Sequence, residues 1–319
     1  MTDSNRKQAM LPSTSQRIDN PLGTAPGFSM RIGGCVFFCL PGVPPEMKRM
    51  LSDAVLPKCR DLLGRKQEAS LIQTISTFGL PESTTGERLE GFGEQFPDLK
   101  LGLRAKFPEI QIRLYGRHED GETLANHMGA AAQWVQEKIG HRVFSLEGES
   151  MPAVIGRLLC ERQETLAVAE SCTGGLISHW LTNVAGSSGY FLLGAVTYAN
   201  ESKMSVLDVS AETLDRYGAV HENTVREMAD GVRQRAGATY GIATSGIAGP
   251  DGGTREKPVG TVCIGISTPE ESKGWRYFFP FGKRRMNKQI FAMSALDLLR
   301  RKLMKLDAGG PGFWVLKDK

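Results

Sequence analysis

The sequence predicts an α/β protein in which a C-terminal α/β sandwich is preceded by a small α+β domain. A length of 319 residues is too great for one ordinary domain, so two or three are expected. Between residues 150 and 305, amphipathic helices alternate with short apolar strands, which is typical of α/β sandwiches. Hydrophobic residues make up 40% of the chain and charged residues 23%, the usual balance of a globular protein.

The composition also narrows the possible partners and compartment. Thirty-nine basic and 35 acidic residues leave a net charge of +4, which suits an anionic substrate without requiring nucleic acid. The six cysteines are scattered, and we interpret them as reduced thiols of a cytosol. The first 18 residues are polar rather than a signal peptide, and the longest strongly apolar stretch, Cys35–Leu40, is too short for a membrane span. We therefore expect a cytoplasmic protein with a small-molecule substrate and no nucleic-acid or membrane partner.

The N-terminal half contains little recognisable chemistry. Residues 1–19 are predicted to be a disordered tail, because they have few apolar residues to bury. Residues 20–66 contain a short buried strand at 34–40 and a helix that begins in Pro41–Met47 and runs to about Leu56. Residues 67–146 form the small α+β domain, with strands at 71–78 and 110–115 and helices at 82–92 and 122–139.

The C-terminal domain, residues 150–305, begins with an amphipathic helix at Met151. Strands are predicted at 165–169, 190–198, 239–244, 259–267 and 275–280. Further helices are predicted from residue 176 and at 201–207, 211–217, 222–236 and 284–305. The segment 306–319 is predicted to be a loose tail.

A candidate nucleophile lies in the loop that joins the first strand of this domain to its second helix. A serine there, Ser171, would be exposed at the edge of the sheet, with backbone N–H groups of the following turn facing whatever it attacks. Alternatively, Ser171 or Thr173 caps the helix. Cys172 is a rival nucleophile. The residues expected to line a substrate here are Cys172, Thr173, Gly174 and Gly175.

A candidate base follows the next strand. Asn200 is a plausible N-cap, which places Lys203 in the first turn of a helix, where the dipole disfavours an ammonium. A partly desolvated lysine there has a lowered pKa and can accept the proton of a serine. The alternative is that Tyr198 is an ordinary sheet residue and Lys203 a solvated surface charge.

A glycine-rich loop spans residues 244–253. It is neither a P-loop nor a dinucleotide fingerprint, although its backbone amides could wrap a phosphate or ribose. Ordinary turn chemistry between two strands is the competing interpretation. The residues of this loop expected to bind substrate are Ser245, Gly246, Gly249, Gly252 and Gly253, and Asn200 is expected to join them.

These three segments together resemble the C-terminal nicotinamide-nucleotide amidohydrolase domain of the competence/damage-inducible CinA family. The matching motifs, in the order of the family, are 169–175, 196–200 with Lys203, 245–253 and 257–262. The resemblance implies hydrolysis of nicotinamide mononucleotide to nicotinate mononucleotide and ammonia, without a cofactor or metal. It implies that Ser171 is the nucleophile, Lys203 its base and Tyr198 a proton relay or donor. It also suggests a dimer or higher oligomer.

The rest of the chain resembles the same family. Motifs at 20–28 and 40–47 are similar to the end of its molybdopterin-binding-like domain, which implies an α/β domain fragment at 20–66. The larger first part of that domain, linked to a metal-dependent ADP-ribose pyrophosphatase, is absent, so we expect that activity to be missing and apolar surface to be uncovered. Residues 68–145 match the family's KH-like middle domain but lack a G-x-x-G loop, so RNA binding is not inferred.

Two other functions stay open. One is an ADP-ribose pyrophosphatase carried by residues 20–60 with a partner fragment, and the other is a non-catalytic module that binds a nucleotide or a protein. The basic stretches 283–285 and 300–302 are interpreted as a solvated helix face rather than a nucleic-acid groove.

Overall fold

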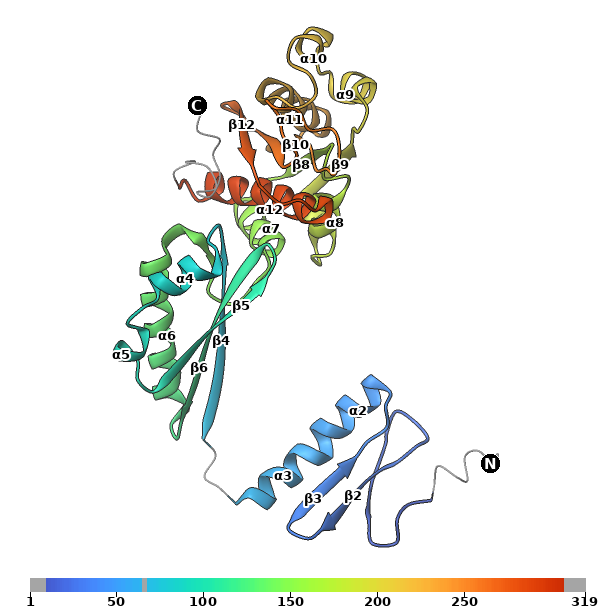
Figure 1. The fold of residues 1–319 in the computed structure, drawn as a ribbon. Helices are drawn as coiled ribbons and strands as arrows, with labels where there is room; N and C mark the ends of the chain where they lie inside the picture. The colour runs from blue at the N-terminus through green and yellow to red at the C-terminus, as the bar shows by residue number, and fades with distance from the viewer. Residues whose placement is uncertain (1–9, 65–67, 307–319) are drawn as a thin grey trace. The chain divides into compact units, whose positions relative to one another are not determined.

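A computed structural model describes residues 10–64 and 68–306 of the chain. The chain divides after residue 68 into two units, which are described separately. The predicted fold class is confirmed: the structure is a mixed α/β protein (Figure 1). The predictions for residues 1–9 and 307–319 lie outside the described residues.

The first unit is a small antiparallel sheet with one helical segment. Strands β1 (Gln16–Ile18), β2 (Gly27–Ile32) and β3 (Cys35–Cys39) pair in that order. Helix α2 (Pro44–Met50) continues through a π-helical turn, η1 (Leu51–Val55), into α3 (Leu56–Leu63), which ends beyond the predicted end near Leu56. The buried core of this unit consists of Ile18, Met50 and Val55.

Two predictions for this unit are wrong. The predicted tail at 1–19 includes β1, which is ordered because it pairs with β2 along its whole length. The strand predicted to be buried at 34–40 exists as β3, but it lies at the sheet edge and its alternate residues are exposed, including Phe37 at 48%. The expectation of uncovered apolar surface agrees with Leu56 and Leu63, which are 46% and 64% exposed.

The second unit begins with the small α+β domain. Its sheet has the order β5-β6-β4-β7, and α4 (Glu82–Arg88), α5 (Phe92–Gln95) and α6 (Gly121–Ile139) cover one face (Figure 1). The strands are β4 (Ala69–Phe78), β5 (Leu99–Lys106), β6 (Glu109–His118) and β7 (Val143–Ser145), and a 3₁₀ turn, η2 (Gly140–Arg142), precedes β7. The sequence did not predict β5, because basic residues and a glycine interrupt its apolar pattern. The predicted helix 82–92 divides at Gly91, whose φ is +85°.

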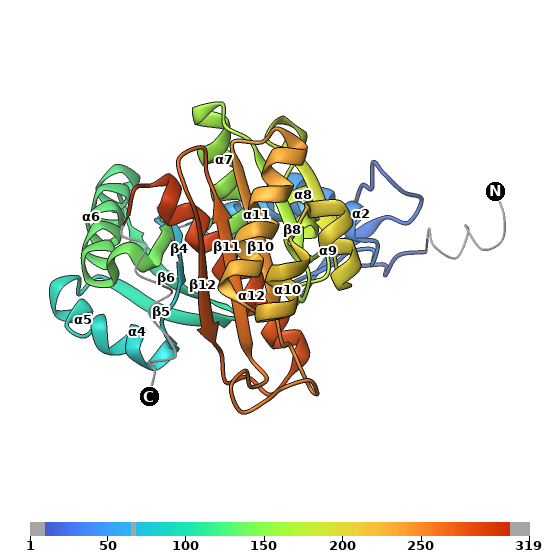
Figure 2. The same cartoon turned by 90° about the horizontal axis from the view of Figure 1, so that it is seen from above.

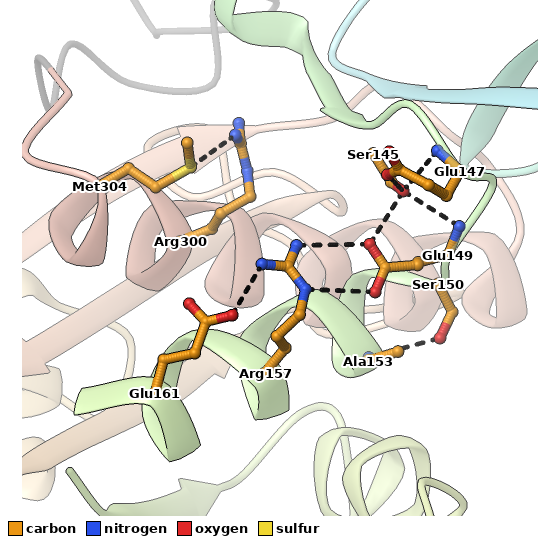
Figure 3. A network of polar contacts seen from close by, with 9 residues as sticks. All are labelled: Ser145, Glu147, Glu149, Ser150, Ala153, Arg157, Glu161, Arg300 and Met304. Atoms are coloured by element: carbon orange, nitrogen blue, oxygen red, sulfur yellow. Dashed lines mark hydrogen bonds and ion pairs between the residues drawn. The ribbon is translucent and has the colours of Figure 1, made fainter. Parts of the chain in front are cut away.

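A polar network connects β7 to the next domain. The Glu147 and Glu149 N–H groups donate to Ser145 Oγ at 3.2 Å, and Ser150 caps α7 (Met151–Arg162). Figure 3 shows the Arg157 guanidinium between the carboxylates of Glu149 and Glu161, at 3.4 and 3.3 Å. These contacts define the exit of the chain from the small domain.

The C-terminal domain is a five-stranded sheet with helices on both faces. The strand order is β12-β11-β10-β8-β9, with β8 (Leu166–Glu170), β9 (Phe191–Val196) and β10 (Tyr240–Gly246) parallel. The strands β11 (Thr261–Ser267) and β12 (Ser272–Phe278) are antiparallel to their neighbours. Helix α11 (Glu222–Ala236) covers one face, and α12 (Arg284–Leu303) covers the other with α7 (Figure 2). The side chains of β8 belong alternately to the two cores. Leu166 and Val168 lie in the core on the side of α7 and α12, and Ala167 and Ala169 lie in the core on the side of α11.

Shorter helices complete this domain: α8 (Leu176–Thr182), η3 (Ser187–Gly189), α9 (Asn200–Leu207) and α10 (Ala211–Tyr217). Glycines in the sheet allow α11 to approach closely. A Cβ at Gly265 would lie 2.1 Å from the Val225 carbonyl oxygen, and one at Gly241 would lie 2.2 Å from that of Ala229. Any side chain at these two positions would push the helix away from the sheet.

The prediction of a solvated basic face at 300–302 is wrong for two of its three residues. Arg300 and Arg301 are each 1% exposed and share the buried carboxylate of Asp297, at 2.8 Å each. Arg300 Nη2 also donates to the His141 carbonyl oxygen at 2.8 Å, and this bond joins α12 to the small domain.

Candidate active site

The three predicted motifs meet at one edge of the C-terminal sheet. Because β8, β9 and β10 are parallel, their carboxyl ends lie at the same edge, which is where α/β sheets bind ligands. Ser171 directly follows β8, and its N–H donates to the Thr244 carbonyl oxygen of β10 at 2.9 Å. The Thr197 N–H, directly after β9, donates to the Glu170 carbonyl oxygen at 2.9 Å.

Lys203 and Ser171 are in direct contact at this edge. Lys203 Nζ lies 3.3 Å from Ser171 Oγ and 3.0 Å from each of the carbonyl oxygens of Thr197 and Tyr198. Lys203 is 0% exposed and Ser171 8% exposed. The alternative of a solvated surface lysine is therefore wrong. A neutral amine here can donate to the two carbonyls and turn its lone pair toward the Ser171 hydroxyl.

Burial lowers the pKa of the Lys203 amine, although the nearby Cys172 and Glu201 act in the opposite direction. The helix position matches the prediction in part. Lys203 lies in the first turn of α9, and its N–H donates to the Ala199 carbonyl oxygen at 3.2 Å. The predicted N-cap is wrong: Ala199 holds that position, and Asn200 is the exposed first residue of the helix. Desolvation, rather than a cap, is what favours the neutral amine.

The rival nucleophile is poorly suited to attack. Cys172 is 5% exposed, and burial raises the pKa of its thiol to about 12. A thiol reacts as the thiolate, which is scarce at neutral pH when the pKa is this high. Ser171, not Cys172, makes the hydrogen bond with Lys203.

Glu170 is a residue of this site that sequence reasoning missed. Its buried carboxylate accepts hydrogen bonds from the N–H groups of Ile177 and Ser178, at 3.1 and 2.8 Å, and from Ser178 Oγ at 2.8 Å. It thereby joins the end of β8 to the first turn of α8 and holds the loop between them. The only indication of this contact in the sequence was an acidic residue shortly before a predicted helix.

The helix-capping alternative for this loop is wrong. The N-cap of α8 is Gly175, with φ of +86°, and no side chain caps from that position. Thr173 Oγ1 instead lies 2.8 Å from Thr244 Oγ1 of β10. Gly174 also has a positive φ, +59°, so the turn that presents Ser171 requires two residues that tolerate left-handed backbone.

Tyr198 joins the pair through its main chain rather than its ring. Its carbonyl oxygen accepts from Lys203, whereas its phenol is part of a 61% exposed residue and accepts from Arg284 Nη2 at 3.1 Å. Arg284 also donates to the Gly249 carbonyl oxygen at 2.8 Å. The proton-relay function of Tyr198 stays a prediction.

A basic cavity of about 590 Å³ lies beside this loop. Arg284, Arg285 and Lys288 of α12 line it together with His179 and Trp180 of α8. A Cβ at Gly174 would lie 3.3 Å from Lys288 Nζ, so the lysine reaches the loop that presents Ser171. Residues 283–285 are exposed, as the sequence interpretation expected. That interpretation missed that Arg284 and Arg285 line this cavity, which depends on tertiary packing.

The glycine-rich loop is explained partly by packing. A Cβ at Gly246 would lie 2.6 Å from the Thr261 carbonyl oxygen, and one at Gly253 would lie 2.7 Å from the Val259 nitrogen. Gly249 and Gly252 have φ of +85° and +87°, as turns require. Ser245 is 1% exposed at the end of β10. Substrate contacts by this loop stay a prediction.

Two features are absent from residues 10–64 and 68–306. No group of three or more His, Cys, Asp or Glu side chains there is arranged to hold a metal ion. Among the helices of that part of the chain, none combines the length and the apolarity needed to cross a membrane.

Comparison with known proteins identifies the family. The family model "CinA C-terminal domain" matches residues 148–303, and "Damage-inducible protein CinA KH domain" matches residues 73–145. A CinA-like protein of Desulfosudis oleivorans is 52% identical over 304 residues, which cover 95% of this chain and 74% of the relative. A CinA-like protein of Desulforapulum autotrophicum is 50% identical over 308 residues, covering 95% and 73%.

Solved structures are similar to part of the chain. The competence damage-inducible protein A (ComA) of Klebsiella pneumoniae is 37% identical, with a TM-score of 0.47, and covers 48% of this chain and 95% of its own. The competence/damage inducible protein CihA of Agrobacterium tumefaciens is 34% identical, with a TM-score of 0.46, and covers 49% and 97%. The family models and the sequence identities of the relatives agree with the resemblance drawn from the motifs: this chain belongs to the CinA family.

Proposed function

We propose that this protein hydrolyses the carboxamide of nicotinamide mononucleotide to give nicotinate mononucleotide and ammonia. The observation that supports this most directly is the 3.3 Å separation of Lys203 Nζ and Ser171 Oγ, with the amine fully buried. A desolvated lysine in hydrogen-bond reach of a serine is an arrangement that activates the hydroxyl for acyl transfer.

Each step of the reaction has a group to perform it. Ser171 Oγ attacks the carboxamide carbon while its proton moves to the neutral Lys203 amine. The backbone N–H groups of Cys172 and Thr173 stabilise the oxyanion. When the C–N bond breaks, the lysine returns the proton to the leaving nitrogen, and ammonia departs. Water then attacks the acyl-enzyme, gives its proton to Lys203, and releases the carboxylate as Ser171 recovers its hydrogen.

The basic cavity supports a phosphorylated substrate. Arg284, Arg285 and Lys288 converge beside the nucleophile loop, and guanidinium groups are suited to phosphate oxygens. The resemblance to the CinA motifs suggests that the carboxamide to be hydrolysed is that of a nicotinamide ring. Together they favour a mononucleotide amide over an uncharged amide.

The test is ammonia release from nicotinamide mononucleotide by the purified full chain in the presence of EDTA. We expect turnover by the wild type and by Cys172→Ala, and none above background by Ser171→Ala. Mass spectrometry of the acidified reaction should find the acyl group on the peptide that contains Ser171. Binding of the nucleotide without ammonia release by the wild type would contradict the proposal and favour a non-catalytic module.

A further inference from the structure

A second cavity, of about 320 Å³, lies where the small domain meets the C-terminal domain within the second unit. Phe78 and the β5–β6 hairpin residue Phe107 line it from the small domain, and Phe281 and Ile290 line it from the C-terminal domain. The rings of Phe107 and Phe281 are nearly perpendicular, with centroids 5.2 Å apart and an interplanar angle of 83°. Its volume is at the lower end of small-molecule sites, enough for one or two fused rings.

Glu109 is the one ionisable residue among the described residues that line this cavity. It is 6% exposed, and within the described part of the chain its buried Oε2 makes no hydrogen bond. Its Oε2 forms an ion pair with Lys106 Nζ at 3.7 Å, which is longer than a hydrogen bond, and the lysine side chain is 56% exposed. Burial raises the pKa of the Glu109 carboxyl, and this ion pair lowers it against the larger effect of burial. A buried carboxylate with an unused acceptor is costly in a folded protein and calls for a partner.

The residues that line this cavity indicate which class of ligand it would bind. Faces of aromatic rings attract cations, and an adjacent carboxylate strengthens that preference. The same carboxylate disfavours anions, and three phenylalanine rings favour a flat apolar body. None of the residues lining this cavity lines the basic cavity beside Ser171. We propose that the cavity lined by Phe78, Phe107 and Phe281 is a binding site for a planar aromatic cation, with Glu109 as its counter-charge.

The experiment uses the full chain carrying Ser171→Ala, so that the outcome is independent of the proposed hydrolysis. The probes are 1-methylquinolinium, a planar cation, and quinoline, a neutral ring of nearly the same shape at pH 8. Isothermal calorimetry should show the cation binding at least tenfold more tightly than quinoline. The added substitution Glu109→Gln should remove the preference for the cation, and Phe281→Ala should lower the affinity for both probes. Phe107→Ala, at a 38% exposed residue, replaces Phe281→Ala if that variant does not fold.

Competition separates this cavity from the Ser171 site. Excess ribose 5-phosphate, which offers the basic cavity a phosphate but carries no aromatic cation, should leave the affinity of the quinolinium unchanged, and so should Arg284→Ala. A Glu109→Gln protein that binds the cation as tightly as its parent would overturn the proposal. Displacement of the quinolinium by ribose 5-phosphate would overturn it as well, because the quinolinium would then occupy the basic cavity rather than this one.

Discussion

Lys203 and Glu109 are both buried ionisable residues of the second unit, but their surroundings differ. Lys203 is 0% exposed, and its Nζ lies 3.0 Å from each of two carbonyl oxygens and 3.3 Å from the Ser171 hydroxyl oxygen. Glu109 is 6% exposed, lies among aromatic side chains, and has one ammonium at 3.7 Å. Desolvation shifts each pKa toward the neutral form. Burial alone therefore shifts the pKa of both groups, whereas the atoms around each group decide what it can do: Lys203 contacts a hydroxyl with which it can exchange a proton, and Glu109 does not.

The largest effect should come from removing the base. Lys203→Met should lower kcat for ammonia release about 10²–10⁴-fold, the usual contribution of a general base. Lys203→Arg should be as inactive, because a guanidinium does not deprotonate in a protein. Lys273→Met, which removes an exposed lysine paired with Glu271, should leave kcat unchanged. If Lys203→Met kept a tenth of the wild-type rate, the lysine would not be the base.

The pH profile distinguishes a desolvated lysine from an ordinary one. Because the neutral amine is the active form, kcat/KM should rise with pH through the pKa of Lys203. Burial lowers that pKa, so the midpoint of the rise should lie below 10.5, the ordinary value. The profile is measured with the wild type from pH 6 to 10. A rate that is flat across this range would remove the lysine from the proton transfer.

Glu170 should affect both stability and activity, because it positions the nucleophile loop. Glu170→Ala leaves two buried N–H groups of α8 without an acceptor, at a cost of about 2–3 kcal/mol of unfolding free energy. Denaturant unfolding measures that loss. Ammonia release should also fall, while Glu212→Ala, an exposed carboxylate in the first turn of α10, should change neither quantity appreciably.

Substitutions in the basic cavity should change the KM for the substrate rather than kcat. Arg284→Ala should raise KM for nicotinamide mononucleotide about tenfold, the value of one charge-assisted hydrogen bond. It should leave KM for nicotinamide riboside, which lacks the phosphate, nearly unchanged. Lys283→Ala, an exposed neighbour outside the cavity, is the matched control. An equal effect on both substrates would mean that Arg284 does not recognise phosphate.

The smallest expected effect concerns Glu109. Its folded-state pKa is raised above the ordinary 4.5, so the folded protein holds that proton more tightly than the unfolded chain. The protonated Glu109 carboxyl therefore contributes fully to the free energy of unfolding below pH 4.5, and this contribution is lost as the pH rises through the folded-state pKa. Glu109→Gln should be more stable than the wild type at pH 8 and equal to it at pH 4, because the amide stays neutral where the carboxyl ionises. Unfolding at the two pH values measures the difference, and a variant less stable at pH 8 would show that the carboxylate is well paired.

Much of the C-terminal domain could be predicted because its signals are local. The helices predicted at 211–217 and 222–236 coincide with α10 and α11, where apolar periodicity and N-cap residues lie within one segment. Ser171 and Lys203 could be selected because each follows a strand within a few residues. Glu170 had only the weak signal of an acid before a helix. Arg284 and Lys288 had none, since Tyr198 and Gly174, which they approach, lie far away along the chain.

The family and the α-helices and strands of the C-terminal domain could be assigned from the chain alone, because periodicity, caps and motifs are properties of neighbouring residues. Which strand ends meet, and therefore that the Lys203 amine lies 3.3 Å from the Ser171 oxygen, depends on how the chain packs in three dimensions. The same packing leaves Arg300 and Arg301 buried rather than solvated. The physical reason is that burial, desolvation and hydrogen-bond partners arise from segments far apart in the chain, whose distances no local pattern contains.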